Sequence, residues 1–266
     1  MKIAIIGTGN LGKSIAKGLI QNQNFDQLYL TKRKVSELDD LPIQDNVHIT
    51  NNNVEAVKHS DIIIFAVQPK QLEEILHESK AFITPNHTLI STITGFSIEK
   101  ISAIVQLPLT IIRAMPNTAI AVGKSMTCIA ANTDDDKKIG IATSIFNQLG
   151  NTLVIPENLM QAATVVCASG IAFWMRLIRA STQAAIQLGF DAKEAQELAM
   201  FTSEGAASLL IQSGNHPEQE IDKVTTPKGC TIEGLNEMEH KGLSSSLIQG
   251  MVASFHKINT IKKEQI

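Results

Sequence analysis

Three glycines near the start of the chain, Gly7, Gly9 and Gly12, have the spacing of a loop that carries phosphate groups. They follow the short apolar run 3–6, which predicts a buried parallel strand, and the apolar residues after them recur at helical spacing. Gly7 can make the sharp turn, Gly9 lets backbone approach a pyrophosphate, and Gly12 lets helix and strand pack closely. Strand, glycine turn and helix in that order predict a dinucleotide-binding fingerprint, whereas another α/β protein would carry such glycines only as a turn. Its residues are Gly7, Thr8, Gly9, Asn10, Leu11 and Gly12.

The second predicted strand, 28–31, ends in Thr31, Lys32 and Arg33. An NAD site usually has an acid at this point to bind the adenosine ribose, and an Arg nearby accommodates the 2′-phosphate of NADP instead. No acid stands at this strand end, so we expect all three residues to bind the cofactor, with NADPH favoured and NADH weaker. The alternative is a solvated basic turn.

Composition narrows the class of protein. The chain has 266 residues and a formal net charge of −3, so no global positive field favours nucleic acid. Cys128, Cys167 and Cys230 are far apart in sequence and odd in number, which argues against a disulfide framework or a zinc site and for a reducing compartment. Met1 leads straight into a strand, and the uncharged stretch 162–175 is shorter than a membrane helix. We expect a cytoplasmic protein with no metal site and no membrane contact.

Apolar runs predict a doubly wound parallel sheet in the first half of the chain. The run 61–67 is the strongest, and Gln68-Pro69 ends it and permits a new helix. Ligands bind at the carboxyl ends of strands in such sheets. An amphipathic helix is expected over 134–149, capped at Gly150, and Asn51 to Asn53 should open an earlier one. The predicted strands are 3–6, 28–31, 47–50, 61–67, 88–92, 110–113, 125–131 and 151–155.

The composition changes after Pro156, where strand-like runs disappear and Ala, Gln, Leu and Met recur at helical spacing. We therefore predict a Rossmann-type NADP-binding domain over 1–156 and an all-helical domain over 157–266. The first helices should cover 157–188 and 192–212, a break follows at 213–217, and Ser244 to Ser246 should open the last helix. Long helices without an obvious polar face usually bury their surface against a partner, so we expect a homodimer or a larger homo-oligomer.

Five stretches of the chain carry a recognisable pattern, at 7–12, 66–69, 113–118, 164–173 and 224–232. The late Thr-Pro-x-Gly-x-Thr segment and the Arg-Ala-Met-Pro-Asn-Thr string are the most specific of them. In order and spacing these stretches resemble the pyrroline-5-carboxylate reductase family, and the resemblance runs the full length of the chain. It implies reduction of the cyclic imine 1-pyrroline-5-carboxylate to L-proline with NAD(P)H, an N-terminal Rossmann domain and a helical C-terminal dimerisation domain.

The segment 224–232 can also be interpreted from its own residue types, without the resemblance. Thr226 is a plausible N-cap and Pro227 a plausible first helical residue, so the amides of Gly229, Cys230 and Thr231 would be free to receive a carboxylate. The alternative is an ordinary capped helix. The resemblance implies that Thr226 and Thr231 place hydroxyls on the substrate, with Thr231 as the catalytic residue near the imine nitrogen.

The resemblance also implies further cofactor contacts. Asn53 would contact the adenosine ribose, and Glu157 would lie near the nicotinamide end. For each single residue the alternative is a cap, a turn former or a surface charge. Two runs complete the set: Ala66, Val67, Gln68 and Pro69 beside the ribose and phosphates, and Pro116 and Asn117 near the nicotinamide.

No His/Asp pair or paired carboxylates are evident, which agrees with positioning as the main contribution to a hydride transfer. The sequence departs from the family pattern at Lys228, where glycine is usual, and in 167–173, which loses a proline. Two other functions therefore stay open: a related reductase of another imine or carbonyl compound, and a non-catalytic nucleotide-binding paralogue that regulates a partner.

Overall fold

The computed structural model describes residues 1–42 and 44–264, and these divide into two compact units. Unit 1 consists of residues 1–169 together with the end of the chain from Ile258, and unit 2 of residues 170–257. The predicted domain boundary after Pro156 precedes this division, and the predicted second domain ends in two residues outside the described part.

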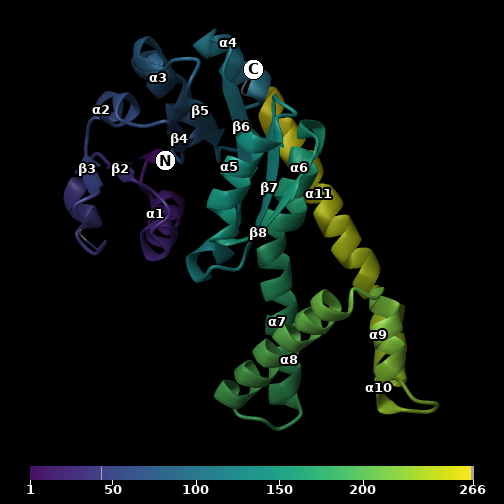
Figure 1. The fold of residues 1–266 in the computed structure, drawn as a ribbon. Helices are drawn as coiled ribbons and strands as arrows, with labels where there is room; N and C mark the ends of the chain where they lie inside the picture. Colours follow the sequence, from purple (N-terminus) through teal and green to yellow (C-terminus); the bar gives the residue numbers. More distant parts are fainter. Residues whose placement is uncertain (43, 265–266) are drawn as a thin grey trace. The chain divides into compact units, whose positions relative to one another are not determined.

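Unit 1 is built on an eight-stranded sheet in the order β3-β2-β1-β4-β5-β6-β7-β8, shown in Figure 1. All neighbours pair in parallel except β6 and β7, which are antiparallel. The first six strands have the order of a Rossmann fold, so the predicted fold class is confirmed. The strands are β1 (Lys2–Ile6), β2 (Gln27–Thr31), β3 (Val47–Thr50), β4 (Ile62–Phe65), β5 (Thr88–Ser91), β6 (Thr110–Met115), β7 (Ser125–Ala131) and β8 (Gly150–Val154).

Helices cover both faces of this sheet because successive side chains of a strand point to opposite sides. In β1, Ile3 and Ile5 pack with the helices α1 (Asn10–Asn22) and α5 (Asp136–Asn147). Ala4 and Ile6 point the other way and pack with α2 (Asn53–Lys58), α3 (Pro69–Ser79) and α4 (Ile98–Val105). The continuous apolar run that predicted a doubly covered strand is explained by these two separate cores.

Residues at the helix boundaries explain where α2 and α3 begin. Asn52 caps α2 by accepting the Glu55 N–H at 3.1 Å, and Pro69 is the first residue of α3.

The prediction that Gly150 caps α5 is wrong. The helix ends at Asn147 with Gln148 as its C-cap, and Gly150 opens β8 with φ +143°. A Cβ at Gly150 would lie 2.1 Å from the Ser125 carbonyl oxygen, so glycine lets β8 pair closely with β7.

The predicted helix over 157–188 is interrupted. After α6 (Met160–Ala163), residues Thr164–Ser169 form a π-helical turn, and α7 (Gly170–Gln187) follows. Within the described residues, the stretch Glu157–Gln187 is long and apolar enough to cross a membrane by length and composition, with 17% of its most apolar window buried. The stretch 162–175 used in the prediction was therefore too short, because the uncharged run begins at Asn158 and the apolar helical stretch continues past Arg176.

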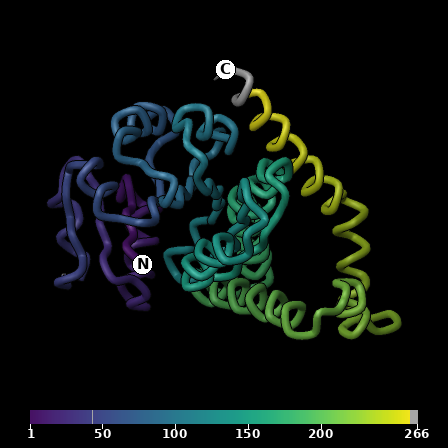
Figure 2. Tube along the Cα trace, turned by 45° about the horizontal axis from the view of Figure 1, so that its top comes forward, coloured from purple at the N-terminus to yellow at the C-terminus, as the bar shows by residue number. Residues whose placement is uncertain are grey.

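Unit 2 consists of α7, α8 (Ala192–Ser213), α9 (Pro217–Val224), α10 (Cys230–His240) and most of α11 (Leu243–Glu264), which Figure 2 traces as one helix. The sequence did not predict α9, which starts with Pro217 behind a capping box at His216. Helices α7 and α8 pack together, and Ala195 and Ala199 are buried. Large apolar side chains such as Phe201 and Ile211 stay exposed within the single chain.

We predict that Gly12→Ala destabilises unit 1. A Cβ at this position would lie 2.3 Å from the Gly7 carbonyl oxygen, which is backbone and has little freedom to move. We expect a loss of about 1–3 kcal/mol in the free energy of unfolding, measured by urea denaturation. Gly140→Ala is the control, since its Cβ meets nothing within 4 Å in helix α5 and should stabilise by about 0.5–1 kcal/mol. Equal stability of the two variants would contradict the prediction.

Candidate functional site

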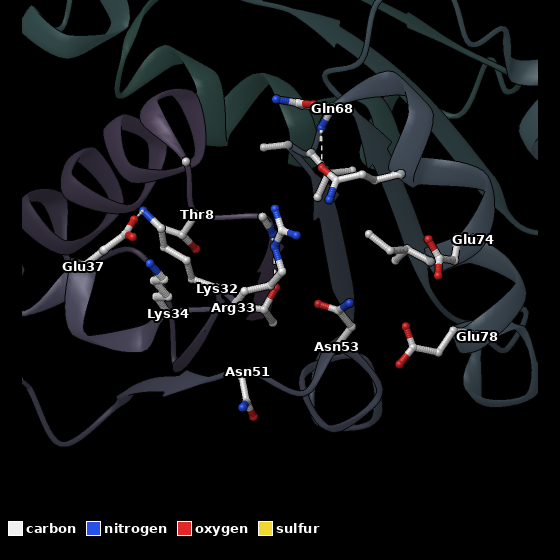
Figure 3. Close-up of a pocket in the computed structure, with 17 residues that line it drawn as sticks. Thr8, Lys32, Arg33, Lys34, Glu37, Asn51, Asn53, Gln68, Glu74 and Glu78 are labelled. Atoms are coloured by element: carbon white, nitrogen blue, oxygen red, sulfur yellow. Dashed lines mark hydrogen bonds and ion pairs between the residues drawn. The ribbon is translucent and has the colours of Figure 1, made fainter.

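A cavity of about 850 Å³ lies at the carboxyl ends of β1, β2 and β4. Figure 3 shows its labelled side chains facing one another from the glycine turn, the end of β2 and helix α3. Ten of the predicted cofactor residues line it: Gly7, Thr8, Gly9, Thr31, Lys32, Arg33, Asn53, Ala66, Val67 and Gln68. The predicted residues Asn10, Leu11 and Gly12 form the first turn of α1, and Pro69 forms the first turn of α3.

The glycine turn is held by the end of β2. Gly7, with φ +93°, donates its N–H to Thr31 Oγ1 at 3.1 Å, and the Thr8 N–H bonds the Thr31 carbonyl at 2.8 Å. Thr31 is 2% exposed, so its hydroxyl orients the turn while its edge lines the cavity. A Cβ at Gly7 would lie 2.3 Å from Val67 Cγ1, which explains why the sharp turn needs glycine.

Two features of this turn fit a phosphate-bearing ligand. A Cβ added at Gly9 would meet nothing within 4 Å, so the backbone there is open toward the cavity. The hydroxyl of Thr8, in a fully buried residue, has no hydrogen-bond partner among the described residues. Buried polar groups are nearly always paired, so this hydroxyl and the free N–H groups at the start of α1 suit a bound anion.

The three cations at the end of β2 are not equivalent. Lys32 Nζ lies 2.8 Å from Glu37 Oε2, and hydrogen bonding to Lys32 lowers the pKa of Glu37. Arg33 is exposed and forms no ion pair within residues 1–42 and 44–264. Figure 3 shows the Arg33 side chain extending over the middle of the cavity, away from Glu37. Lys34 also lines the cavity and forms no ion pair in the described part of the chain, but its charge helps to lower the pKa of Glu37. Arg33 is therefore the cation of the three that acts on no acid and is left for a ligand.

Sequence reasoning missed seven lining residues. Helix α3 contributes Glu74 and Glu78, which are four residues apart and so share one helix face. The sequence did indicate that a helix begins at Pro69, directly after the predicted strand 61–67. One face of that helix could therefore have been expected to lie beside the ligand. The other missed residues carry no motif that would single them out, and they are Lys34, Glu37, Asn51, Gln71 and Ile75.

Asn117 lies outside this cavity, two residues after the end of β6. Its Oδ1 accepts the Ala119 N–H at 3.0 Å, and its Nδ2 donates to the Cys167 carbonyl at 3.2 Å. Its own N–H bonds Ser125 Oγ at 3.1 Å, and Pro116 beside it is buried. The Asn117 side chain therefore joins the end of β6 to the π-helical turn.

Glu157 is likewise engaged by protein groups. Its Oε1 accepts from Arg113 Nη1 at 3.2 Å and from the Ile98 N–H at 2.8 Å. Burial lowers the pKa of Arg113, and the hydrogen bond and charge of Glu157 oppose that shift. One carboxylate thus links β6, the start of α4 and the segment after β8.

The late segment folds differently from the prediction that Thr226 caps a helix, which is wrong. Helix α10 begins at Cys230 with Gly229 as its N-cap. Before it, the Gly229 N–H bonds the Thr226 carbonyl at 2.9 Å, and Lys228 has φ +61°. Pro227 and Lys228 are therefore the central residues of a tight turn, because Lys228 has a positive φ. A helix cannot begin at Pro227 in this conformation. The Gly229 amide is therefore not free, whereas Cys230 and Thr231 lie in the first turn of α10.

Comparisons with known proteins agree with this architecture. Residues 157–261 match the pyrroline-5-carboxylate reductase dimerisation family, and residues 2–95 match a family described as NADP oxidoreductase, coenzyme F420-dependent. The chain is 45% identical to pyrroline-5-carboxylate reductase 1 of Dictyostelium discoideum over 269 residues, spanning 96% of this chain and 49% of that protein. It is 40% identical to pyrroline-5-carboxylate reductase 2 of the same organism, over 96% of this chain and 91% of that one.

A solved structure shows the same fold. A pyrroline-5-carboxylate reductase from Coxiella burnetii superimposes with a TM-score of 0.91 at 28% identity, covering 97% of each chain. The two halves therefore are an NADP-binding domain and a dimerisation domain, which implies a homo-oligomer. The apolar stretch 157–187 lies inside the part that matches the dimerisation family.

We predict that Glu157→Ala destabilises unit 1 because it leaves Arg113, 6% exposed, without its acid and the Ile98 N–H without its acceptor. A hydrogen bond to a charged group contributes about 1.5–3 kcal/mol, which sets the expected drop in the free energy of unfolding. Glu157→Gln should cost less, since an amide oxygen still accepts. The control is the exposed Glu99→Ala, expected within about 0.5 kcal/mol of the parent. The role assigned to Glu157 fails if its alanine variant unfolds at the same urea concentration as the control.

Proposed function

We propose that NADPH is the preferred cofactor of this chain, which belongs to the pyrroline-5-carboxylate reductase family and reduces the cyclic imine 1-pyrroline-5-carboxylate to L-proline with NAD(P)H. The observation that carries the cofactor preference is Arg33, a cation over the cavity without an acidic partner among the described residues. A guanidinium is suited to the 2′-phosphate that distinguishes NADPH from NADH.

The residues of unit 1 divide the work of holding the cofactor. The turn 7–12 and the start of α1 receive the pyrophosphate, with Thr8 Oγ1 as one donor. Thr31 keeps the turn in place, and Asn53 is assigned to the adenosine ribose, which its position in the cavity wall supports. The segment 66–69 flanks the ribose and phosphates, an assignment supported by Ala66, Val67 and Gln68 in the cavity wall.

Pro116, Asn117 and Glu157 act at the nicotinamide end in this proposal. The side chains of Asn117 and Glu157 form hydrogen bonds with other protein groups. Their proposed role is therefore to position the backbone near the nicotinamide. When bound, NADPH supplies a hydride to the imine carbon, and the protein orients the substrate and directs a proton to the imine nitrogen.

Residues at the start of α10 are proposed to bind the substrate. The amides of Cys230 and Thr231, at the positive end of the helix dipole, receive its carboxylate, while Thr226 and Gly229 shape the turn that exposes them. The Thr231 hydroxyl is the proposed catalytic group beside the imine nitrogen.

We further infer that the domain boundary relevant to function follows Pro156, that the enzyme works as a homodimer or larger assembly, and that it is cytoplasmic. The dimerisation family begins at residue 157, which supports the boundary. The described cysteines are all free thiols, which supports a reducing compartment.

Purified protein separates the readings that the sequence left open. NADPH oxidation is followed with 1-pyrroline-5-carboxylate, with other cyclic imines or carbonyl compounds, and with neither. Turnover that is fastest with 1-pyrroline-5-carboxylate supports the assignment. Preference for another imine or carbonyl would point to a related reductase, and NADPH binding without turnover would point to a regulatory paralogue.

Arg33→Ala should lose a charge-assisted contact of about 1.5–3 kcal/mol, which corresponds to roughly a ten- to a hundredfold weaker NADPH affinity. NADH affinity should hardly change, because NADH lacks the 2′-phosphate. Both affinities are measured by fluorescence titration, with Lys70→Ala as the control, an exposed cation outside the cavity wall. An unchanged NADPH/NADH ratio would show that Arg33 does not read the 2′-phosphate.

Thr231→Ala should lower turnover far more than NADPH affinity, because its hydroxyl is assigned to the imine and not to the cofactor. The control is Thr143→Ala, whose hydroxyl bonds the Ile139 carbonyl of its own helix at 3.0 Å. Steady-state kinetics and NADPH titration of both variants provide the check. A Thr231→Ala enzyme with the parent rate would remove this residue from the mechanism.

A further inference from the structure

Two cysteines that are 39 residues apart in sequence meet in unit 1. Cys128 Sγ lies 3.9 Å from Cys167 Sγ, and both are free thiols. Their wide spacing along the chain gave no indication that the two side chains lie close together. The fold brings β7 and the π-helical turn 164–169 together and makes a pair of them.

The two thiols differ in setting. Cys128 is 3% exposed and lies in β7, between Met115 of β6 and Leu153 of β8. Cys167 is only partly buried, so it is the member of the pair that a small solute can reach. The hydrogen bond from the Cys128 thiol lowers the pKa of Cys167 to about 7, and that same bond, together with burial, raises the pKa of Cys128. The accessible sulfur is therefore also the more nucleophilic one near neutral pH.

We propose that Cys128 and Cys167 form a redox-active pair that peroxide converts to an intramolecular disulfide. The Cys167 thiolate attacks one oxygen of hydrogen peroxide, the O–O bond breaks, and a sulfenic acid and hydroxide form. The Cys128 sulfur then attacks the Cys167 sulfur, the S–O bond breaks, and the leaving hydroxide takes the Cys128 proton and departs as water. The proton that the Cys167 thiol gave to solvent neutralises the hydroxide of the first step. Two thiols are oxidised, and one peroxide is reduced to two waters.

The geometry allows this bond with a local movement. A disulfide has an S–S length of about 2.05 Å, so the sulfurs must approach by about 1.9 Å from their separation of 3.9 Å. Cys128 is fixed by strands on both sides, so the movement falls on the turn that carries Cys167. A π-helical turn departs from regular helix geometry and is a common feature of functional sites.

The disulfide also has a route to the reaction. The carbonyl of Cys167 accepts the Asn117 Nδ2–H at 3.2 Å, and Asn117 caps the turn after β6. A shift of Cys167 therefore pulls on the segment assigned above to the nicotinamide end. This consequence rests on the proposed function, and it predicts that the oxidised enzyme has lower turnover.

The test uses the full chain, reduced, desalted and then exposed to hydrogen peroxide. Peptide mapping under non-reducing conditions identifies the linked cysteines, and NADPH oxidation with 1-pyrroline-5-carboxylate is measured on the same samples. We expect a Cys128–Cys167 linkage with the loss of two hydrogen atoms, a loss of turnover that follows the oxidised fraction, and recovery with dithiothreitol. Cys230→Ser should still form the linkage, whereas Cys128→Ser should not.

Other results would overturn the proposal. A map that shows only sulfinic acid at Cys167, or only links between chains, would exclude the pair as a disulfide site. A complete Cys128–Cys167 linkage with unchanged turnover would exclude its connection to the reaction. If the reduced protein lacks reductase activity, the proposed function fails, while the peptide map still decides whether the pair is redox-active.

Discussion

The close approach of α1 to the end of β1 is the constraint on which the nucleotide half depends. The Gly7 carbonyl oxygen occupies the space that a side chain at position 12 would need, and Val67 of the neighbouring strand end fills the space beside Gly7. Thr31 then holds the same turn from the other side. The ends of β1, β2 and β4 meet at this turn, so the first free N–H groups of α1 face a cavity and not open solvent. The positions of Arg33 and Asn53 around that cavity follow from the same strand order.

The sequence predicted much of this half because its signals are local. Eight apolar runs became eight strands, and the glycine spacing placed the turn correctly. The antiparallel pairing of β7 with β6 could not be predicted, because strand pairing depends on contacts between residues far apart in the chain. The role of Gly150 was missed for the same reason, because the Ser125 backbone that requires glycine lies in another strand.

At the start of α10, one residue misled the sequence analysis. A Thr-Pro pair reads as a cap followed by a first helical residue, but Lys228 adopts positive φ and turns the chain before the helix begins. Only local backbone geometry distinguishes the two. The pairing of Cys128 with Cys167 and the engagement of Glu157 by Arg113 are tertiary contacts that no spacing along the chain encodes. Unit 2 shows the complementary limit: large apolar side chains such as Phe201 and Ile211 are exposed in the single chain, in a part that matches a dimerisation family, and a sequence does not show how copies of the chain pack together.

If a dinucleotide lies over the open backbone at Gly9, a methyl group at that position should block its binding without disturbing the fold. A Cβ at Gly9 has free space in the protein alone, and φ is −79°, so Gly9→Ala should fold with the stability of the parent. The same methyl group would stand where the pyrophosphate must approach. We expect the Gly9→Ala protein to unfold like the parent and to lose much of its NADPH affinity, measured by isothermal titration calorimetry. An unchanged affinity in a fully folded Gly9→Ala protein would contradict it.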